Sequence, residues 1–201
     1  VALPSLKSIA DTSQRLLING NDALALGAMA AGCRFIASYP MTPASSIMEY
    51  MAEKGRDYGV VTVHVEDEIA AINMAAGAGY TGARAMVATS GGGFALMVEG
   101  LALAGMTETP VVVVLGQRPG PATGLPTRTE QGELWFALHA GHGEFPRAVL
   151  SPADAAEAFD AAVTAFNLAE KYQSPVIVLT DLHLASSFMS VEPFKLDKVV
   201  I

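Results

Sequence analysis

The sequence predicts an α/β fold, a doubly wound parallel sheet of about six strands with helices on both faces. Short runs of β-branched and apolar residues alternate along the chain with longer segments of helical length. Pro110, Pro146 and Pro175 each stand just before one of the short runs, where a missing backbone N–H costs little. Repeated strand–helix units of this length are typical of parallel sheets, because the return to the next parallel strand needs a crossover.

The predicted strands are apolar runs without the strict alternation of a half-exposed strand. Such runs suit strands that are buried on both faces. In chain order they are Arg34–Tyr39, Val60–Val65, Arg84–Ser90, Val111–Gly116, Arg147–Leu150 and Val176–Thr180.

The predicted helices lie between these strands. Ser151 and Pro152 are typical of a helix start, with Ser151 as the N-cap and Pro152 at the first helical position. In chain order the helices are Asp22–Ala31, Ser45–Asp57, Asp67–Tyr80, Phe94–Met106 and Ala153–Lys171.

A chain of 201 residues is long enough for one domain with a substantial core. We expect an N-terminal extension over 1–18, the domain itself over 19–187, and a tail over 188–201 that leads to a further domain. With 51% apolar and 16% charged residues, the chain has more apolar surface than one core absorbs. Part of that surface is therefore expected to be buried against other subunits.

Composition also argues against several classes of function. The net charge of −8 comes without basic clusters, which disfavours nucleic acid and anionic membranes as partners. The longest apolar stretch, Ala23–Cys33, falls well short of the ~20 residues that cross a bilayer, and no secretory signal is visible, so a cytoplasmic location is expected. Cys33 is the single cysteine and the four histidines are scattered, so we expect no metal or iron–sulfur site in this chain.

Four polar or glycine-rich loops follow predicted strands and should meet at one edge of the sheet. In open α/β sheets, ligands bind beyond the carboxyl ends of the strands. The connection from Gln117 to Glu133 is the longest, and loops of this length in compact domains are usually functional or disordered. The other three are Tyr39–Pro43, Glu66–Glu68 and Ser90–Gly93. A site is expected where these loops converge.

Glu68 is the leading candidate for a catalytic residue. With Glu66 and Asp67 it opens a helix built almost wholly from small and apolar residues, and such a helix is normally packed on all sides. Its first turn presents a carboxylate at the edge of a dry interior, beside the positive end of the helix dipole. The residues alone leave a plainer alternative open, in which all three are ordinary favourable charges at a helix N-terminus.

Five motifs stand in a specific order and spacing, although each alone is weak. They are Tyr39–Pro43 (YPMTP), Glu66–Ala71 (EDEIAA), Thr89–Phe94 (TSGGGF), Glu108–Pro110 (ETP) and Arg118–Gln131 (RPGPATGLPTRTEQ). From about Asn19 to Ser187 the chain resembles the alpha subunit of 2-oxoacid:ferredoxin oxidoreductases, most closely the 2-oxoglutarate type, and there the pyrimidine-binding domain for thiamine diphosphate. It departs from the full-length pattern at Gly92, where Pro would fit equally, and the later domains of that subunit do not follow Ile201.

The resemblance implies a thiamine diphosphate-binding fold whose active site is shared between chains. This chain would hold the pyrimidine ring, while a partner beta subunit would hold the diphosphate with its Mg²⁺, and partner chains a [4Fe-4S] cluster. Glu68 matches the glutamate that hydrogen-bonds the ring nitrogen N1′. Glu66 or Asp67 in that role is the less favoured alternative.

The resemblance also implies that Pro40, Ser90, Gly91 and Gly92 bind the cofactor. A glycine run lets backbone N–H groups approach a cofactor or a partner loop closely. Three glycines also suit a plain flexible turn, and this interpretation stays open. The run is not a phosphate-binding Gly-x-x-x-x-Gly-Lys-Ser/Thr motif, because no Lys follows it.

By the same resemblance, Thr42, Arg118 and Arg128 contact the substrate. Arginine holds a carboxylate through two parallel hydrogen bonds in a fixed plane. Arg118 matches the arginine near the 2-oxo acid end of the substrate, and Arg128 the residue that could meet the second carboxylate of 2-oxoglutarate. The alternatives are a Thr42 that caps the helix from Ala44, and an Arg128 that is solvated or bridged to Glu130.

The implied activity is oxidative decarboxylation of a 2-oxoacid, best matched by 2-oxoglutarate, to its acyl-CoA with reduction of ferredoxin. Coenzyme A, ferredoxin, the beta subunit and further gamma and delta subunits are the expected partners, and activity is expected only in that assembly. The nearest alternative is the same chemistry on pyruvate, branched-chain oxoacids or arylpyruvates. The alternative of another class is a non-catalytic α/β scaffold or regulatory module.

Overall fold

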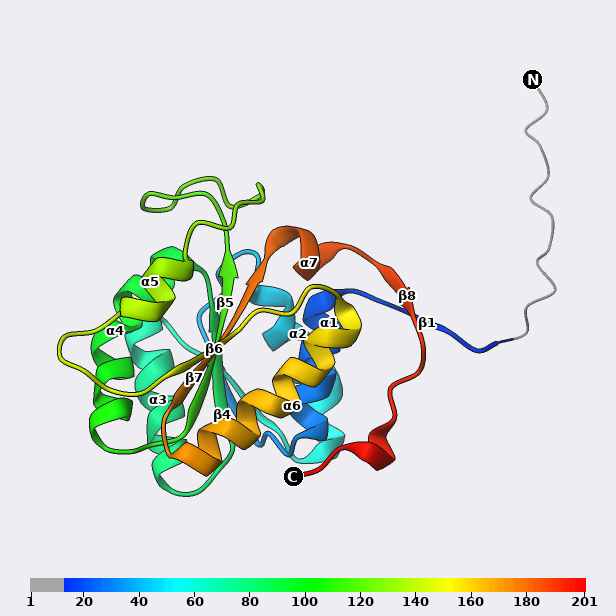
Figure 1. Ribbon diagram of the computed structural model, residues 1–201, viewed down its shortest axis with the longest axis horizontal. Helices are drawn as coiled ribbons and strands as arrows, with labels where there is room; N and C mark the ends of the chain where they lie inside the picture. The colour runs from blue at the N-terminus through cyan, green and yellow to red at the C-terminus, as the bar shows by residue number, and fades with distance from the viewer. Residues whose placement is uncertain (1–12) are drawn as a thin grey trace.

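The computed structural model describes residues 13–201, so residues 1–12 of the expected N-terminal extension lie outside the described part. A six-stranded, all-parallel sheet in the order β3-β2-β4-β5-β7-β6 forms its centre (Figure 1). The strands are β2 (Phe35–Ser38), β3 (Val61–His64), β4 (Ala85–Thr89), β5 (Val111–Gln117), β6 (Ala148–Leu150) and β7 (Pro175–Asp181). The predicted fold class is confirmed, and all six predicted strands are present.

Helices cover both faces of this sheet (Figure 1). One face carries α1 (Gly20–Ala30), α2 (Ser45–Lys54) and α6 (Ala155–Tyr172); the other carries α3 (Glu68–Tyr80), α4 (Gly91–Met106) and the short α5 (Leu134–His139). Within β5, Val112 and Val114 belong to the core beneath α1 and α6, whereas Val113 and Leu115 belong to the core beneath α3 and α4. Successive side chains of a strand point to opposite faces, so two cores explain the unbroken apolar run.

Four of the five predicted helices begin one to three residues from the predicted start, and only α2 begins where expected. Two of these differences have a clear cause. The N-cap of α6 is Asp154 and not Ser151. Asp154 accepts the N–H of Glu157 at 2.9 Å while Glu157 accepts the N–H of Ala153 at 2.9 Å, and this pair of side-chain bonds fixes the start. The helix expected from Phe94 begins at Gly91, so the glycine run is a first helical turn rather than a flexible one.

Several short elements were not predicted. Besides α5 they are α7 (Leu182–Ser186), the 3₁₀ turns η1 (Gly55–Tyr58) and η2 (Leu196–Lys198), and the strands β1 (Leu16–Ile18) and β8 (Met189–Val191). β1 and β8 pair antiparallel in a separate two-stranded sheet. This sheet joins a segment before residue 19 to one after residue 187. Three-residue strands so far apart in sequence carry no local signal, since only tertiary pairing defines them.

The carboxyl ends of the six parallel strands share one edge of the sheet. Residues 118–133 project from the end of β5 at this edge as a long loop (Figure 1). Over the described residues 13–201, no helix is both long and apolar enough to span a membrane.

Candidate active site

Buried polar atoms without a hydrogen-bond partner gather at the carboxyl edge of the sheet. Native proteins pair almost all such atoms, so each exception calls for an explanation. Within residues 13–201, every such atom except Thr62 Oγ1 belongs to a residue near the carboxyl end of a strand or, for Glu133, at the end of the long loop after β5. The atoms are Glu68 Oε1, Ser90 Oγ, Arg118 Nε, Glu133 Oε2 and Thr180 Oγ1. Donors and acceptors left open together indicate a ligand site.

The three carboxylates that open α3 have separate positions. Asp67 is the N-cap and accepts the N–H of Ala70 at 2.7 Å, and Glu66 is exposed. Glu68 is the first helical residue, and only 3% of it is exposed. Its Oε1 is buried without a partner, so a buried acceptor stands ready for a donor that this chain does not supply.

Gly93 in the first turn of α4 leaves room for the Glu68 carboxylate. A Cβ at Gly93 would lie 2.7 Å from Glu68 Oε1 and 2.1 Å from Thr89 Oγ1. No other residue type fits that space without moving these groups. The N-cap of α4 is Ser90, which is fully buried and makes no capping bond with its side chain. The start of α4 therefore keeps open polar groups beside Glu68.

Arg118 is buried at the end of β5, with 6% of its surface exposed. Its Nη1 donates to the main-chain carbonyl of Thr42 at 2.6 Å, while its Nε has no partner. This bond ties the loop after β2 to the loop after β5. Thr42 is exposed, and the N-cap of α2 is Ala44 without a side-chain capping bond, so Thr42 does not cap that helix.

A pocket of about 450 Å³ lies between the start of α4 and the long loop. Its lining includes Gly91, Gly92, Arg118, Glu130 and Glu133. Two of the glycines, one arginine and two carboxylates thus face one space. Thr42 lines a separate pocket of about 390 Å³ beside α2 and α7.

Glu133 is a residue of this pocket that the sequence did not reveal. A Cβ at Gly91 would lie 1.7 Å from Glu133 Oε1, so Gly91 lets the carboxylate reach the helix start. The pKa of Glu133 is raised to about 6, chiefly by burial, with a lowering effect from Arg118 and a smaller raising effect from Glu130. The only signal in the sequence is an acid at the end of the long loop, and that position alone does not distinguish it from Glu130.

Of the predicted site residues, only Arg118, Gly91 and Gly92 line this pocket. Glu68 and Ser90 are buried at the starts of α3 and α4 without lining it. Pro40 is exposed in the loop after β2. Arg128 is exposed in the long loop, and its side chain forms no ion pair with Glu130 or another residue of the described chain. The structure therefore places Glu68 and Ser90 at the first turn of α4 and Arg118 with Gly91 and Gly92 at the pocket. It leaves Thr42, Pro40 and Arg128 outside both.

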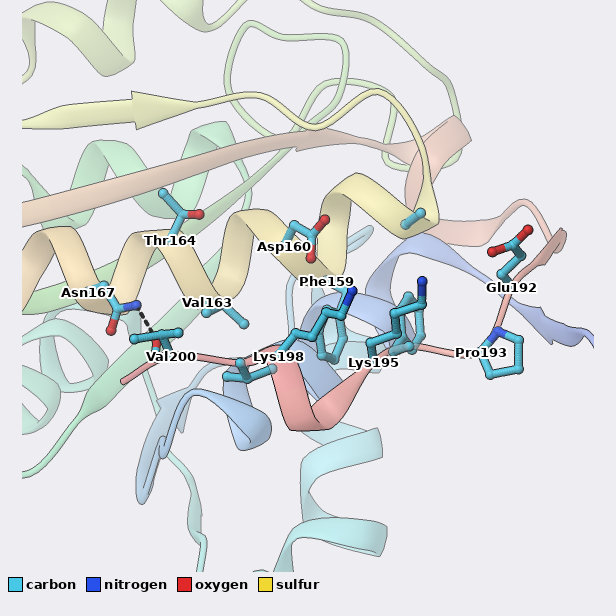
Figure 2. A pocket seen from close by; sticks show the side chains of 13 residues that line it. Phe159, Asp160, Val163, Thr164, Asn167, Glu192, Pro193, Lys195, Lys198 and Val200 are labelled. Atoms are coloured by element: carbon cyan, nitrogen blue, oxygen red, sulfur yellow. Dashed lines mark hydrogen bonds between the residues drawn. The ribbon is translucent and has the colours of Figure 1, made fainter.

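A pocket of about 510 Å³ between α6 and the C-terminal segment has a different character (Figure 2). Phe159, Val163 and Pro193 contribute apolar surface, and Asp160 and Lys198 stand at its sides (Figure 2). None of the unpartnered buried atoms belongs to a residue that lines it. We therefore assign the chemistry to the carboxyl edge.

Comparison with known proteins identifies the family of the chain. Residues 26–201 match the family described as pyruvate flavodoxin/ferredoxin oxidoreductase, thiamine diphosphate-binding. The chain belongs to this family. The resemblance inferred from the motifs is thereby confirmed.

Individual relatives are similar over most of this chain. The alpha subunit of 2-oxoacid:ferredoxin oxidoreductase 1 from Sulfurisphaera tokodaii is 49% identical over 209 residues, covering 97% of this chain and 33% of the relative. The 2-oxoglutarate synthase subunit KorA from Methanothermobacter marburgensis is 48% identical over 169 residues, covering 84% of this chain and 45% of the relative.

A solved structure shows the same fold. The 2-oxoglutarate:ferredoxin oxidoreductase from Magnetococcus marinus, with 2-oxoglutarate, coenzyme A and succinyl-CoA bound, superposes with a TM-score of 0.92 at 46% identity. The match covers 94% of this chain and 33% of that chain. This chain thus spans between a third and a half of the length of these relatives.

Proposed function

We propose that this chain forms the pyrimidine-binding half of a thiamine diphosphate-dependent 2-oxoacid:ferredoxin oxidoreductase. The observation that carries the proposal is the buried Glu68 Oε1 without a partner, in a chain of a thiamine diphosphate-binding family. Glu68 holds the ring nitrogen N1′ through that atom, and Ser90, Gly91 and Gly92 face the cofactor from the start of α4. Pro40 borders it from the loop after β2.

The residues present fit such a cofactor. An acceptor in a water-poor site makes a stronger hydrogen bond than one in bulk solvent, and Gly93 keeps the space beside it free of a side chain. When bound, thiamine diphosphate supplies the electron sink for decarboxylation of a 2-oxoacid. Glu68 fixes the position of a proton on the ring, and the closely packed start of α4 excludes water from that contact.

The substrate is a 2-oxoacid, with 2-oxoglutarate as the favoured member. Arg118 binds its 2-oxo acid end through the unpartnered Nε, and Thr42 approaches from the loop that Arg118 holds. Arg128, in the long loop, is the residue proposed for the second carboxylate. Similarity to the KorA subunit and to the Magnetococcus enzyme supports the choice of 2-oxoglutarate.

The remaining parts of the reaction belong to partner chains. A beta subunit holds the diphosphate, Mg²⁺ and a [4Fe-4S] cluster; gamma and delta subunits complete the assembly, which uses coenzyme A and passes electrons to ferredoxin in the cytoplasm. The alpha-subunit names of the relatives support partner chains. So do large apolar side chains exposed on α3 and α4, such as Tyr80 at 76% and Met106 at 84%.

Replacement of Glu68 by Gln tests the proposal. In the assembly with its partner chains, Glu68→Gln should lower oxoacid-dependent dye reduction by at least ~100-fold, because the amide cannot hold the ring proton as the carboxylate does. Rates are compared with and without thiamine diphosphate and coenzyme A. Glu66→Gln, at an exposed carboxylate two residues away, is the matched control and should keep full activity. Unchanged turnover in Glu68→Gln would favour a non-catalytic scaffold.

Replacement of Arg128 by Ala tests the substrate. The variant should lose ~30- to 100-fold in kcat/KM on 2-oxoglutarate and little on pyruvate, since only the dicarboxylate has a second anionic end to lose. Arg56→Ala, at an exposed arginine of η1, removes the same charge elsewhere. Equal losses on both oxoacids would contradict the role of Arg128 and favour the alternative of a monocarboxylic or arylpyruvate substrate.

A further inference from the structure

Glu133 joins the two ends of the long loop. Its N–H donates to the side-chain Oε1 of Gln117 at 3.0 Å, and its carboxylate accepts the main-chain N–H of Arg118. Each end of the loop therefore holds the other through one bond in each direction. Gln131 adds a third tie, since its Nε2 donates to Asp181 Oδ2 at 2.5 Å at the end of β7.

The carboxylate of Glu133 also faces the charge of the site. It lines the same pocket as Arg118, and Gly91 lets it approach the first turn of α4. Its Oε2 is buried without a partner. Among the described residues, the charged groups that act on it are Arg118 from the end of β5 and Glu130 from the loop. The parts of α4 and α5 that lie nearest to Glu133 are their N-terminal ends.

We propose that Glu133 positions Arg118 for an oxoacid and takes up one proton from solvent when the oxoacid carboxylate binds beside that arginine. This inference rests on the proposed function. It adds a residue for which neither the motifs nor the family resemblance gave a role.

The physical argument follows from like charges. Arg118 is held by a bond to Thr42 and by the nearby Glu133, so its position does not depend on the substrate. A substrate carboxylate at the open Nε brings a further negative charge into a pocket that Glu130 and Glu133 already line. Nearby like charges disfavour the ionised form of a carboxyl group, so a proton on the open Oε2 relieves the repulsion. The pKa of Glu133 is already raised to about 6, chiefly by burial. A small further rise of this pKa on substrate binding is therefore enough for the group to gain a proton near neutral pH.

Linkage gives the sign of the pH effect. A group that gains a proton on binding favours the complex at low pH, and the preference is lost as the pH rises above the pKa of the complex. The wild-type KM should therefore rise several-fold from about pH 6 to about pH 8, with little change in kcat.

Calorimetry on the assembled enzyme with thiamine diphosphate tests the proposal without turnover. The probe is N-oxalylglycine, in which an amide nitrogen replaces the methylene next to the keto group of 2-oxoglutarate. Titrations near pH 7 in two buffers of different ionisation enthalpy give the number of protons taken up. The wild type should take up a fraction of a proton, and Glu133→Gln none while binding at least as tightly, because the amide oxygen still accepts the Arg118 N–H.

Two further variants separate position from charge. Glu133→Ala lacks the acceptor for the Arg118 N–H and should bind the probe at least ~10-fold more weakly at every pH. Glu144→Gln, at an exposed carboxylate that does not line the pocket, should behave like the wild type in proton uptake and affinity. A pH-independent KM in Glu133→Gln would support the proposal from kinetics.

The outcomes distinguish this inference from the proposed function. Proton uptake in Glu133→Gln equal to that of the wild type would overturn the role of Glu133 and leave the oxoacid site intact. Wild-type affinity in Glu133→Ala would overturn the positioning role. A wild-type enzyme that binds no oxoacid analogue and turns over no oxoacid would overturn both.

Discussion

The outer helices on the two faces of the sheet, α6 on one and α3 with α4 on the other, differ in what covers them. α6 turns polar residues outward, and the C-terminal segment of the chain lies along it (Figure 2). Phe194 stacks on Phe159 with ring centroids 4.3 Å apart, and Asn167 donates to the carbonyl of Val200 at 2.7 Å. α3 and α4 instead expose large apolar side chains, among them Ile69, Met74, Tyr80, Leu96, Leu103 and Met106.

This difference distinguishes a helix covered by solvent and its own chain from helices that leave apolar surface uncovered. An amphipathic helix such as α6 needs only solvent and its own chain on the outside, whereas helices that are apolar on every side belong between protein layers. The α3 and α4 pair is also the one whose first turns carry Glu68 and the glycine run. The exposed apolar face and the candidate active site thus share the same two helices.

Glycines in α1, α4 and α3 differ in what surrounds the position of their missing Cβ. In α1, Gly27 lets the helix approach α6, because a Cβ there would lie 2.4 Å from the carbonyl oxygen of Phe159. In α4, Gly93 makes room for the Glu68 carboxylate. In α3, Gly77 has no atom within 4 Å of its missing Cβ. Substitution by Ala at these three positions tests the comparison.

Gly93→Ala should have the largest effect, on activity. The new methyl group would displace the side chains of Glu68 and Thr89, both of which can move. If Glu68 acts as proposed, turnover of the assembled enzyme should fall at least ~100-fold with only modest loss of stability, because the carboxylate loses its position. Dye reduction and thermal unfolding of the same preparation measure the two. Normal turnover in this variant would show that Glu68 need not occupy its present position.

Gly27→Ala should have the next largest effect, on stability. The obstacle here is the main chain of Phe159, which cannot rotate away as a side chain can. Overpacking of this kind lowers the free energy of unfolding by about 1–3 kcal/mol. Urea denaturation measures the loss, and the kcat of the enzyme that remains folded should stay unchanged. An unaltered denaturation midpoint would mean that α1 and α6 can separate freely.

Gly77→Ala should have the smallest effect, and of opposite sign. An exposed helical glycine replaced by alanine gains about 0.5–1 kcal/mol in the free energy of unfolding of the chain. In the assembly, the same methyl group would meet whatever covers α3. Weaker association of the partner chains, seen by analytical ultracentrifugation, would sharpen the comparison. If the variant were more stable both as the separate chain and in the assembly, the partner chains would contact a surface other than α3.

Much of the fold could be predicted because its signals are local. The apolar runs that became β4, β5 and β7 can be buried only between two helical layers, and the helices between them dictate a parallel order. The helix starts were less predictable. Asp154 and Ser151 are both good N-caps by type, and only the reciprocal bonds with Glu157 and Ala153 decide between them.

The candidate site could be predicted in part. The motif around Glu68 placed a carboxylate at a helix start, and the family resemblance gave that residue an expected role. Its burial next to Gly93 and its lack of a partner depend on how α3 packs against α4. The mutual bonds of Glu133 with Gln117 and Arg118 join residues at opposite ends of a loop, so no spacing rule could find them.

By itself, the sequence determined the class of fold, the edge at which the loops meet and the family to which the chain belongs, because periodicity and motif order are properties of the chain. Only the tertiary structure decided which of three neighbouring carboxylates is buried, and which acid stands beside Arg118. The physical reason is that burial and unpaired polar atoms arise from contacts between elements. Such contacts exist only when the helices and loops are packed on the sheet.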